Sequence, residues 1–222
     1  MSPRIRAAHR TDRRGEERRN ALLEAATHVF LTHGFEKATL GEVIARSGGS
    51  RATLYARFGS KEGLFAAIIE AKCRQIVVAL EDGRIDGGLE EVLREFATVY
   101  MGELMSVESL ALYRLVIGES ERFPKLGAAV FQAGPNAAAE RLIAYLRSNV
   151  NASILELSDS DIDIAARQFL EMVKGDLHMR ALMRTKKRPT KKEVERCIDL
   201  AVKVFLHGAV VRRGGSQEGS GG

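Results

Sequence analysis

The sequence is poor in cysteine and in proline. Its 222 residues include two cysteines, Cys73 and Cys197, and four prolines. Neither cysteine lies in a CxxC pair or beside a histidine, so their spacing supports neither a zinc site nor a disulfide framework. We expect two buried structural cysteines, with a redox sensor as the alternative. The scarcity of proline leaves long stretches of the chain free to form helices.

Long apolar runs and a secretory signal are also missing. The longest uncharged apolar stretch, residues 64–69, is much shorter than the roughly 18 to 20 residues that cross a bilayer. The N-terminus has no apolar core after its arginines, which argues against a signal peptide. We therefore expect a cytoplasmic protein without a membrane partner.

Catalytic motifs are missing as well. The chain contains no GxSxG, no HExxH and no glycine-rich nucleotide loop, which are signatures of hydrolases, metalloproteases and nucleotide-binding enzymes. Its histidines have no metal-ligand spacing. We therefore expect no enzyme, no metal site and no cofactor.

Apolar residues recur at helical spacing nearly throughout the chain, whereas no alternating strand pattern of useful length occurs. A first helix is expected over residues 21–30, with a stop at Gly34. Thr39 and Glu42 have the spacing of a capping box and predict the start of a second helix. Further stripes predict helices that include residues 61–80, 92–104, 110–117, 126–150 with a break at Gly134-Pro135, 162–177 capped by Ser158 or Asp159, and 194–205 capped by Thr190. The sequence thus predicts an all-α fold.

Charge is distributed unevenly along the chain. Residues 1–61 contain 12 Lys and Arg against 6 Asp and Glu, whereas residues 62–222 contain 22 against 23. The whole net charge of +5 therefore lies in the first quarter of the chain. A basic segment joined to a near-neutral body is typical of a nucleic-acid-binding module on a separate domain. The alternative is a solvated, arginine-rich tail.

The basic segment contains a helix-turn-helix pattern. A short helix over residues 40–46 is followed by Gly48-Gly49 and by a helix that Ser50 caps and that ends near Phe58. The surrounding run is specific: Thr39, Ile44-Ala45, Gly48, Ser50, Thr53-Leu54-Tyr55, Phe58, Ser60-Lys61-Glu62 and Leu64. This run resembles the N-terminal signature of the TetR/AcrR family of bacterial transcriptional regulators over residues 16–68. Gly49 departs from the signature, which has a valine that packs under the turn.

The resemblance implies contacts with double-stranded DNA. Thr39, Tyr55 and Lys61 are expected to bind backbone phosphates. Base edges are expected to face Arg51, Ala52 and Thr53, which follow the capping residue Ser50, while Arg57 suits either role. The alternatives are a packed side chain for Tyr55 and a solvated charge for Arg51. A basic arm before the first helix suits a minor groove or serves only as a solubilising tail; its arginines are Arg4, Arg6, Arg10, Arg13 and Arg14.

We divide the chain into a flexible basic arm (1–15), a helix-turn-helix domain (16–62), a connecting helix and linker (63–88), an effector-binding and dimerisation domain (89–211) and a disordered tail (212–222). The resemblance implies an apolar effector cavity in the fourth part, and a homodimer that forms through the last two helices. A single protomer is not expected to bury the apolar stripes of those helices. Candidate effector-binding residues, with core packing as the alternative for each, are Phe96, Tyr100, Tyr113, Ile117, Phe131 and Met172. Glu119 or Arg114 is expected to serve as a polar anchor.

These patterns predict a homodimeric, DNA-binding repressor that a small hydrophobic effector releases from a palindromic operator. The close alternatives are an activator of the same fold and a repressor without an effector. An enzyme on a helical scaffold is a more distant alternative, because the catalytic motifs are missing.

Overall fold

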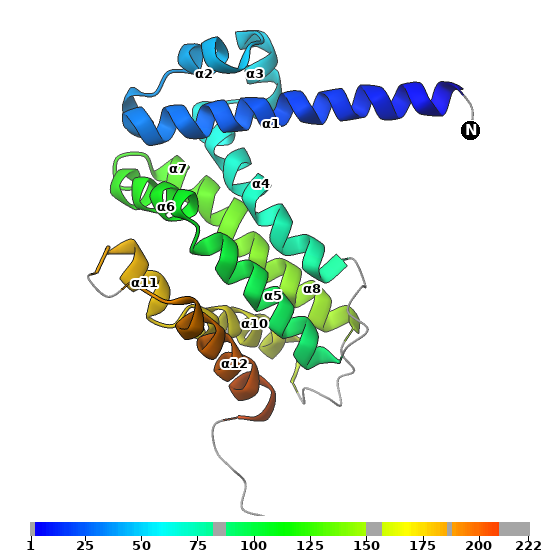
Figure 1. The fold of residues 1–222 in the computed structure, drawn as a ribbon, viewed down its shortest axis with the longest axis vertical. Coiled ribbons are helices and arrows are strands. Elements are labelled where there is room, and N and C mark those ends of the chain that lie inside the picture. Colours follow the sequence, from blue (N-terminus) through cyan, green and yellow to red (C-terminus); the bar gives the residue numbers. More distant parts are fainter. Residues whose placement is uncertain (1–2, 82–87, 150–156, 186–187, 209–222) are drawn as a thin grey trace, which may run out of the picture.

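The computed structural model describes residues 3–81, 88–149, 157–185 and 188–208. This part of the chain contains helices and no strand, which confirms the all-α prediction. Helix α1 crosses one end of the molecule with α2 and α3 beside it, and the other helices extend away from that end (Figure 1). Within the described residues, no helix is both long enough and apolar enough to span a membrane.

The first four helices form the head of the molecule. Their bounds are α1 (Pro3–Lys37), α2 (Leu40–Ser47), α3 (Arg51–Phe58) and α4 (Lys61–Glu81). The capping box predicted at Thr39 is present, because the Thr39 hydroxyl accepts from Glu42 N at 3.3 Å and the Glu42 carboxylate accepts from Thr39 N at 2.9 Å. These two hydrogen bonds satisfy backbone N–H groups that the start of α2 would otherwise leave unpaired.

Helix α1 extends further toward the N-terminus than we expected. It begins at Pro3, within the segment (1–15) that we predicted to be a flexible arm. Pro3 is the first residue of α1, a position that proline favours. The residues after it are mostly Arg, Ala and Glu, which have high helix propensity. At the other end, Gly34 leaves the helical conformation with φ 76°, as predicted. The side chains of the five arm arginines lie outside the described part of the chain.

The remaining helices follow in the order α5 (Leu89–Leu104), α6 (Val107–Glu119), α7 (Pro124–Phe131), α8 (Ala137–Asn149), α10 (Asp159–Lys174), α11 (Leu177–Leu182) and α12 (Lys191–His207). The predicted break at Gly134-Pro135 is a π-helical turn, η1 (Gln132–Asn136), between α7 and α8. Proline has no N–H to donate, so a local widening of the helix accommodates it. The predicted linker after α4 and the predicted tail 212–222 fall largely or wholly outside the described residues.

Two hydrophobic cores divide the molecule. The head core combines α1–α4 with residues of α6 and α7, among them Leu112 and Leu126. The body core combines α5, α8, α10, α11 and α12 around Phe96, Leu142 and Phe169. Helices α6 and α7 therefore pack with the head, although they come after the linker in the sequence.

The apolar stripes of α10 and α12 are buried within a single chain. Phe169 and Val173 of α10 and Val202 of α12 are each 0% exposed. Helices α5 and α8 of the same chain pack against them. Our expectation that one protomer cannot bury these stripes is therefore wrong. The large apolar side chains that α10 and α12 leave exposed are instead Ile164 and Leu200, at 56% and 59%.

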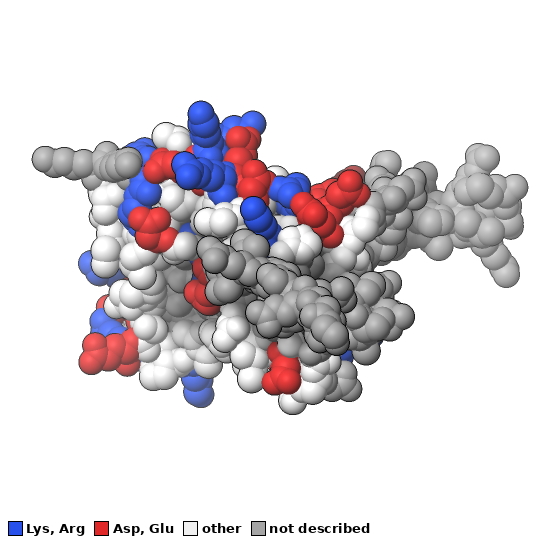
Figure 2. Space-filling view, turned by 90° about the horizontal axis from the view of Figure 1, so that it is seen from below, with Lys and Arg blue, Asp and Glu red and all other residues white. Residues whose placement is uncertain are grey.

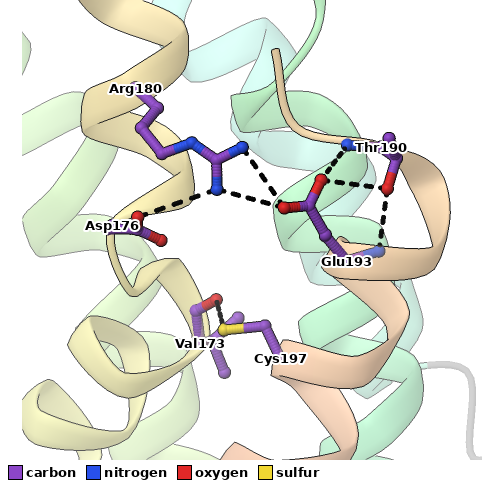
Figure 3. Close-up of polar contacts among 6 residues, drawn as sticks. All are labelled: Val173, Asp176, Arg180, Thr190, Glu193 and Cys197. Atoms are coloured by element: carbon purple, nitrogen blue, oxygen red, sulfur yellow. Dashed lines mark hydrogen bonds and ion pairs between the residues drawn. The ribbon is translucent and has the colours of Figure 1, made fainter. Parts of the chain in front are cut away.

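Polar contacts fix α11 against α12 (Figure 3). Thr190 caps α12, and the Glu193 carboxylate accepts from Thr190 N at 2.9 Å. The same carboxylate accepts from both Nη atoms of Arg180 at 3.3 Å. The hydrogen bonds from Thr190, assisted by Arg180, lower the pKa of Glu193 to about 2, so this carboxylate is charged whenever the protein is near neutral pH.

Both cysteines are half-buried free thiols. The Cys197 thiol donates to the Val173 carbonyl at 3.4 Å (Figure 3). Burial raises the pKa of both thiols, that of Cys73 to about 11. Because the thiolate is the reactive form, these protonated thiols favour a structural role over a redox sensor.

Candidate nucleic-acid interface and ligand cavity

Helix α3 is held to the head by one face and is otherwise exposed. Leu54 is fully buried in the head core, and Phe58 packs against that core. Tyr55 is 53% exposed, so the alternative of a packed tyrosine is not what the structure shows. The exposed residues of the helix are Arg51, Ala52, Thr53, Tyr55, Ala56 and Arg57. A short, rigidly anchored helix with this surface has the form of an element that enters a DNA groove.

The N-termini of α2 and α3 both carry hydroxyl caps. The Thr39 hydroxyl donates to the Glu42 carboxylate at 2.8 Å. The Ser50 hydroxyl accepts from Thr53 N at 3.2 Å and lies 3.0 Å from the Thr53 hydroxyl. Helix N-termini attract phosphate through their free N–H groups and their dipole. Thr39 and Ser50 thus stand where a phosphate contact is favourable, while their hydroxyls already have partners within the chain.

The turn between α2 and α3 depends on glycine. Gly48 has φ 75° and Gly49 has φ 109°, a region that residues with a Cβ rarely adopt. A valine at position 49, as in the family signature, would be strained in this backbone conformation. This turn uses two consecutive glycines to reverse the chain.

Lys61 connects the start of α4 to the end of α1. Its Nζ donates to the carbonyls of Glu36 at 3.1 Å and Ala38 at 3.2 Å. The same ammonium lies 4.6 Å from the centroid of the Phe35 ring, within the range of a cation–π interaction. Two of its three N–H groups are thus used inside the head, which leaves one for a phosphate.

A groove of about 810 Å³ lies between α1 and the helix-turn-helix. It brings Thr53 and Arg57 of α3 together with Arg18 of α1. Sequence reasoning missed Arg18, because the specific run of motif residues begins at Thr39 and only the packing of α1 across α2 places Arg18 in this groove. Arg46, exposed in the last turn of α2, is a further basic residue of the helix-turn-helix that sequence reasoning missed.

The opposite end of the molecule has a different surface. Figure 2 views the protein from the end away from α2 and α3 and shows acidic and basic side chains interleaved where they are coloured. This pattern agrees with the near-neutral charge of residues 62–222. The excess positive charge therefore belongs to the head.

A cavity of about 60 Å³ lies where the head core meets the body core. Helices α4, α5, α6 and α7 and the π-helical turn η1 all contribute to its wall, which is mainly apolar. Two predicted effector-binding residues, Tyr100 and Tyr113, line it. The lining residues are Ile69, Lys72, Cys73, Tyr100, Glu103, Leu104, Ser109, Leu112, Tyr113, Val116, Val130, Gly134 and Pro135.

Four other predicted effector-binding residues lie away from this lining. Phe96 is buried in the body core, where its ring stacks on Tyr100 with centroids 6.2 Å apart. Met172 packs against the same core. Ile117 and Phe131 are 58% and 53% exposed. A helix turns by about 100° per residue, so residues adjacent in one apolar stretch cannot all face the same cavity.

Arg114 and Glu119 have contacts elsewhere. The Arg114 guanidinium donates to the carbonyls of Leu182 at 2.7 Å and Ala181 at 2.8 Å. It thereby caps the C-terminal end of α11, where cations are favoured. Glu119 ends α6 and its carboxylate faces Gly34 of α1. The structure thus assigns Arg114 to the contact between α6 and α11.

Sequence reasoning missed the charged pair in the cavity wall. Lys72 Nζ lies 3.3 Å from Glu103 Oε1 and 2.5 Å from Glu108 Oε2. The Ser109 hydroxyl also donates to Glu103 Oε1, at 2.6 Å. Burial alone would lower the pKa of Lys72, but the hydrogen bond and charge of the two carboxylates raise it. The sequence offered one signal for this pair, a lysine within the apolar stretch of α4. Its partner Glu103 lies 31 positions away, so the sequence alone did not identify it.

His178 packs behind the cavity. Its side chain is 7% exposed and meets the Tyr113 ring edge to face, with centroids 5.1 Å apart. Its Nε2 has no hydrogen-bond partner within the described residues. Burial, assisted by the charge of Lys174, lowers the pKa of His178 to about 4, so the imidazole is neutral near pH 7.

A helix-turn-helix head with an exposed second helix, carried by a larger helical body, defines a DNA-binding transcriptional regulator. Residues 22–68 match the family described as bacterial regulatory proteins, tetR family. Residues 91–208 match the C-terminal domain of AefR-like transcriptional repressors. The chain therefore belongs to the TetR family, whose members are transcriptional regulators and not enzymes. The resemblance found in the sequence is confirmed.

Solved structures share the fold over most of the chain. A TetR-family regulator from Mesorhizobium loti MAFF303099 is 25% identical and has a TM-score of 0.70, over 87% of this chain and 96% of that one. The flavonoid-responsive regulator FrrA is 34% identical with a TM-score of 0.67, over 86% of this chain and 96% of that one.

Curated relatives match over a shorter stretch. The transcriptional repressor ComR of Escherichia coli (strain K12) is 40% identical over 52 residues, which are 23% of this chain and 25% of ComR. The first curated relatives are matched over only 25% to 38% of their own length.

Proposed function

We propose that this TetR-family regulator is a homodimeric repressor that a small hydrophobic effector releases from a palindromic operator. The observation that carries this proposal is an apolar cavity at the junction of the two cores, in a chain whose α3 is exposed. The match of residues 91–208 to the C-terminal domain of AefR-like repressors supports repression over activation. The proposal includes a cytoplasmic location, because such a protein acts on chromosomal DNA.

In this proposal, α3 reads the operator and its surroundings hold the DNA backbone. Arg51 and Thr53 are exposed in the first turn of α3, where recognition helices contact base edges. An arginine there suits the O6 and N7 atoms of guanine. Tyr55 and the remaining N–H of Lys61 are suited to phosphates, as is Arg18 across the groove.

The homodimer is proposed to form through α10 and α12 of each protomer, which carry the two apolar stripes that the sequence assigns to the last two helices. Ile164 of α10 and Leu200 of α12 are large apolar side chains that the single chain leaves exposed. An isologous contact would cover both residues in each protomer, and it would present two copies of α3 to DNA.

Release is proposed to follow from a shift of the head relative to the body. Helix α4 begins at Lys61 in the head and forms part of the cavity wall through Ile69 and Cys73. Helices α6 and α7 also join the head core to this wall. A ligand that enlarges the cavity would therefore change the separation of the two α3 helices. A coupling of about 1 to 3 kcal/mol would weaken operator binding by about 5 to 150-fold. The name of FrrA, which describes a response to flavonoids, supports an aromatic effector.

Selection of binding sites from a pool of random duplex DNA tests this proposal. A dimer with two α3 helices should enrich a palindrome whose half-site centres lie one or more helical turns apart, at about 34 to 36 Å per turn. Light scattering at micromolar concentration should report a dimer. Enrichment of a single half-site by a persistent monomer would contradict the proposal, as would the absence of any enriched sequence.

A further inference from the structure

We propose that the cavity between the two cores takes an uncharged, largely apolar ligand that carries a hydroxyl group, and that it disfavours carboxylates and ammonium ions. This inference rests on the proposed function, because it names the chemical class of the effector. It follows from the charge balance and the unused hydrogen-bonding groups of the cavity wall.

The charges of the wall are balanced. Among the described residues, the charged side chains that line the cavity are Lys72 and Glu103, and their Nζ and Oε1 atoms are 3.3 Å apart. These two side chains are only 19% and 17% exposed. Glu108 lies outside the lining and is 50% exposed, and it also pairs with Lys72, at 2.5 Å, so both carboxylates share this ammonium. An ion of either sign would lose its hydration on entry without meeting an unpaired opposite charge.

The wall also offers hydrogen-bonding groups that the described chain does not use. Glu103 Oε1 accepts hydrogen bonds from both Lys72 and Ser109, so the other carboxylate oxygen, Oε2, can accept a hydrogen bond from a ligand. The Tyr100 side chain is 6% exposed and lines the cavity, and its hydroxyl has no hydrogen-bond partner among the described residues. A ligand hydroxyl can donate to Glu103 and accept from Tyr100. A hydrocarbon would leave both groups unpaired, which disfavours it.

The apolar part of the ligand must enlarge the cavity. A space of about 60 Å³ is smaller than the roughly 150 Å³ that accepts a benzene ring. At η1 the wall is closely packed, because a Cβ added to Gly134 would lie 3.0 Å from Ile69 Cγ2 on α4. Because π-helical turns are points of adjustment in a helix, a ring would enter by separating η1 from α4.

Calorimetric titration of the full-length protein, without DNA, tests the ligand class with four matched probes. They are 2-naphthol, 2-methoxynaphthalene, 2-naphthoate and 2-naphthylmethylammonium, which share a ring system and differ in charge or in the hydroxyl donor. At neutral pH, 2-naphthol should bind about tenfold more tightly than either ion and several-fold more tightly than the methoxy compound. Binding of an ion more tightly than 2-naphthol would overturn the proposal, and so would failure of all four probes to bind.

Two opposite substitutions test the charge balance itself. Glu103→Gln should shift the ratio of affinities by about tenfold toward 2-naphthoate, and Lys72→Gln should shift it by about tenfold toward 2-naphthylmethylammonium. Loss of packing alone would not shift the ratio of the two affinities in opposite directions in the two variants. If one variant fails to fold, the other is sufficient for the test. Glu95→Gln, at an exposed position of the same helix as Glu103, is the matched control and should keep the wild-type order. An unchanged order in the folded Gln variants at 72 and 103 would overturn the proposal.

The effect of 2-naphthol on DNA binding separates this inference from the proposed function. If the order of affinities holds but 2-naphthol leaves operator affinity unchanged, the ligand class stands and effector release fails. If 2-naphthoate binds more tightly than 2-naphthol and releases DNA, effector release stands and the ligand class is wrong.

Discussion

Replacing Phe35 with alanine should lower the free energy of unfolding by about 3 to 5 kcal/mol. Phe35 is 0% exposed, and its ring packs against Phe30, Phe65 and Phe123 with centroids 5.7, 6.0 and 5.2 Å away. Phe123 belongs to the turn between α6 and α7, so this aromatic cluster joins the head to the cavity wall. Urea denaturation of the wild type and the variant measures the loss.

The matched control for this substitution is Leu31→Ala. Leu31 lies four residues before Phe35, ahead of the break at Gly34, and is 36% exposed, so its loss should be much smaller, about 1 kcal/mol or less. Equal losses for the two variants would contradict the conclusion that α6 and α7 share a core with the head. The Phe35 ring also contacts the Lys61 ammonium through a cation–π interaction. We therefore expect Phe35→Ala to lower the affinity for the operator as well as the free energy of unfolding.

Stability should fall as the pH drops from about 7 to about 5, and His178 should account for about 2 kcal/mol of the fall. Its pKa is lowered from 6.5 to about 4 in the folded protein. Between these values the unfolded chain binds a proton that the folded protein does not, so acid favours unfolding. His178→Phe keeps a ring against Tyr113 and removes the titration.

Urea denaturation at the two pH values tests this effect. His178→Phe should lose about 2 kcal/mol less than the wild type on acidification. His28→Gln, an exposed position on α1, is the control and should follow the wild type. Identical pH dependence in His178→Phe and the wild type would show that the folded protein accommodates the protonated imidazole.

Local signals in the sequence were sufficient to place the starts of four helices. Thr39, Ser50, Ser158 and Thr190 each combine a hydroxyl with the backbone N–H three residues later, and all four cap helices in the structure. Such caps involve only neighbouring residues, so the sequence contains the whole interaction. The helix-turn-helix could be predicted for the same reason.

The cavity and the division into two cores depend on contacts between distant residues. Lys72 meets Glu103 across 31 positions, and Arg114 reaches Leu182 across 68. A stripe of apolar residues shows that a helix is buried but not which helix covers it. This is why the stripes of α10 and α12 were assigned to a second protomer, whereas α5 and α8 cover them.

The central claim, that α3 reads base sequence, is tested most directly by the affinity of Arg51→Ala for DNA. Fluorescence anisotropy at one fixed salt concentration should compare the selected operator with a random duplex. If Arg51 contacts guanine, the variant should lose about 1 to 3 kcal/mol per half-site on the operator and much less on random DNA. Equal losses on both duplexes would contradict the claim and make Arg51 a phosphate contact.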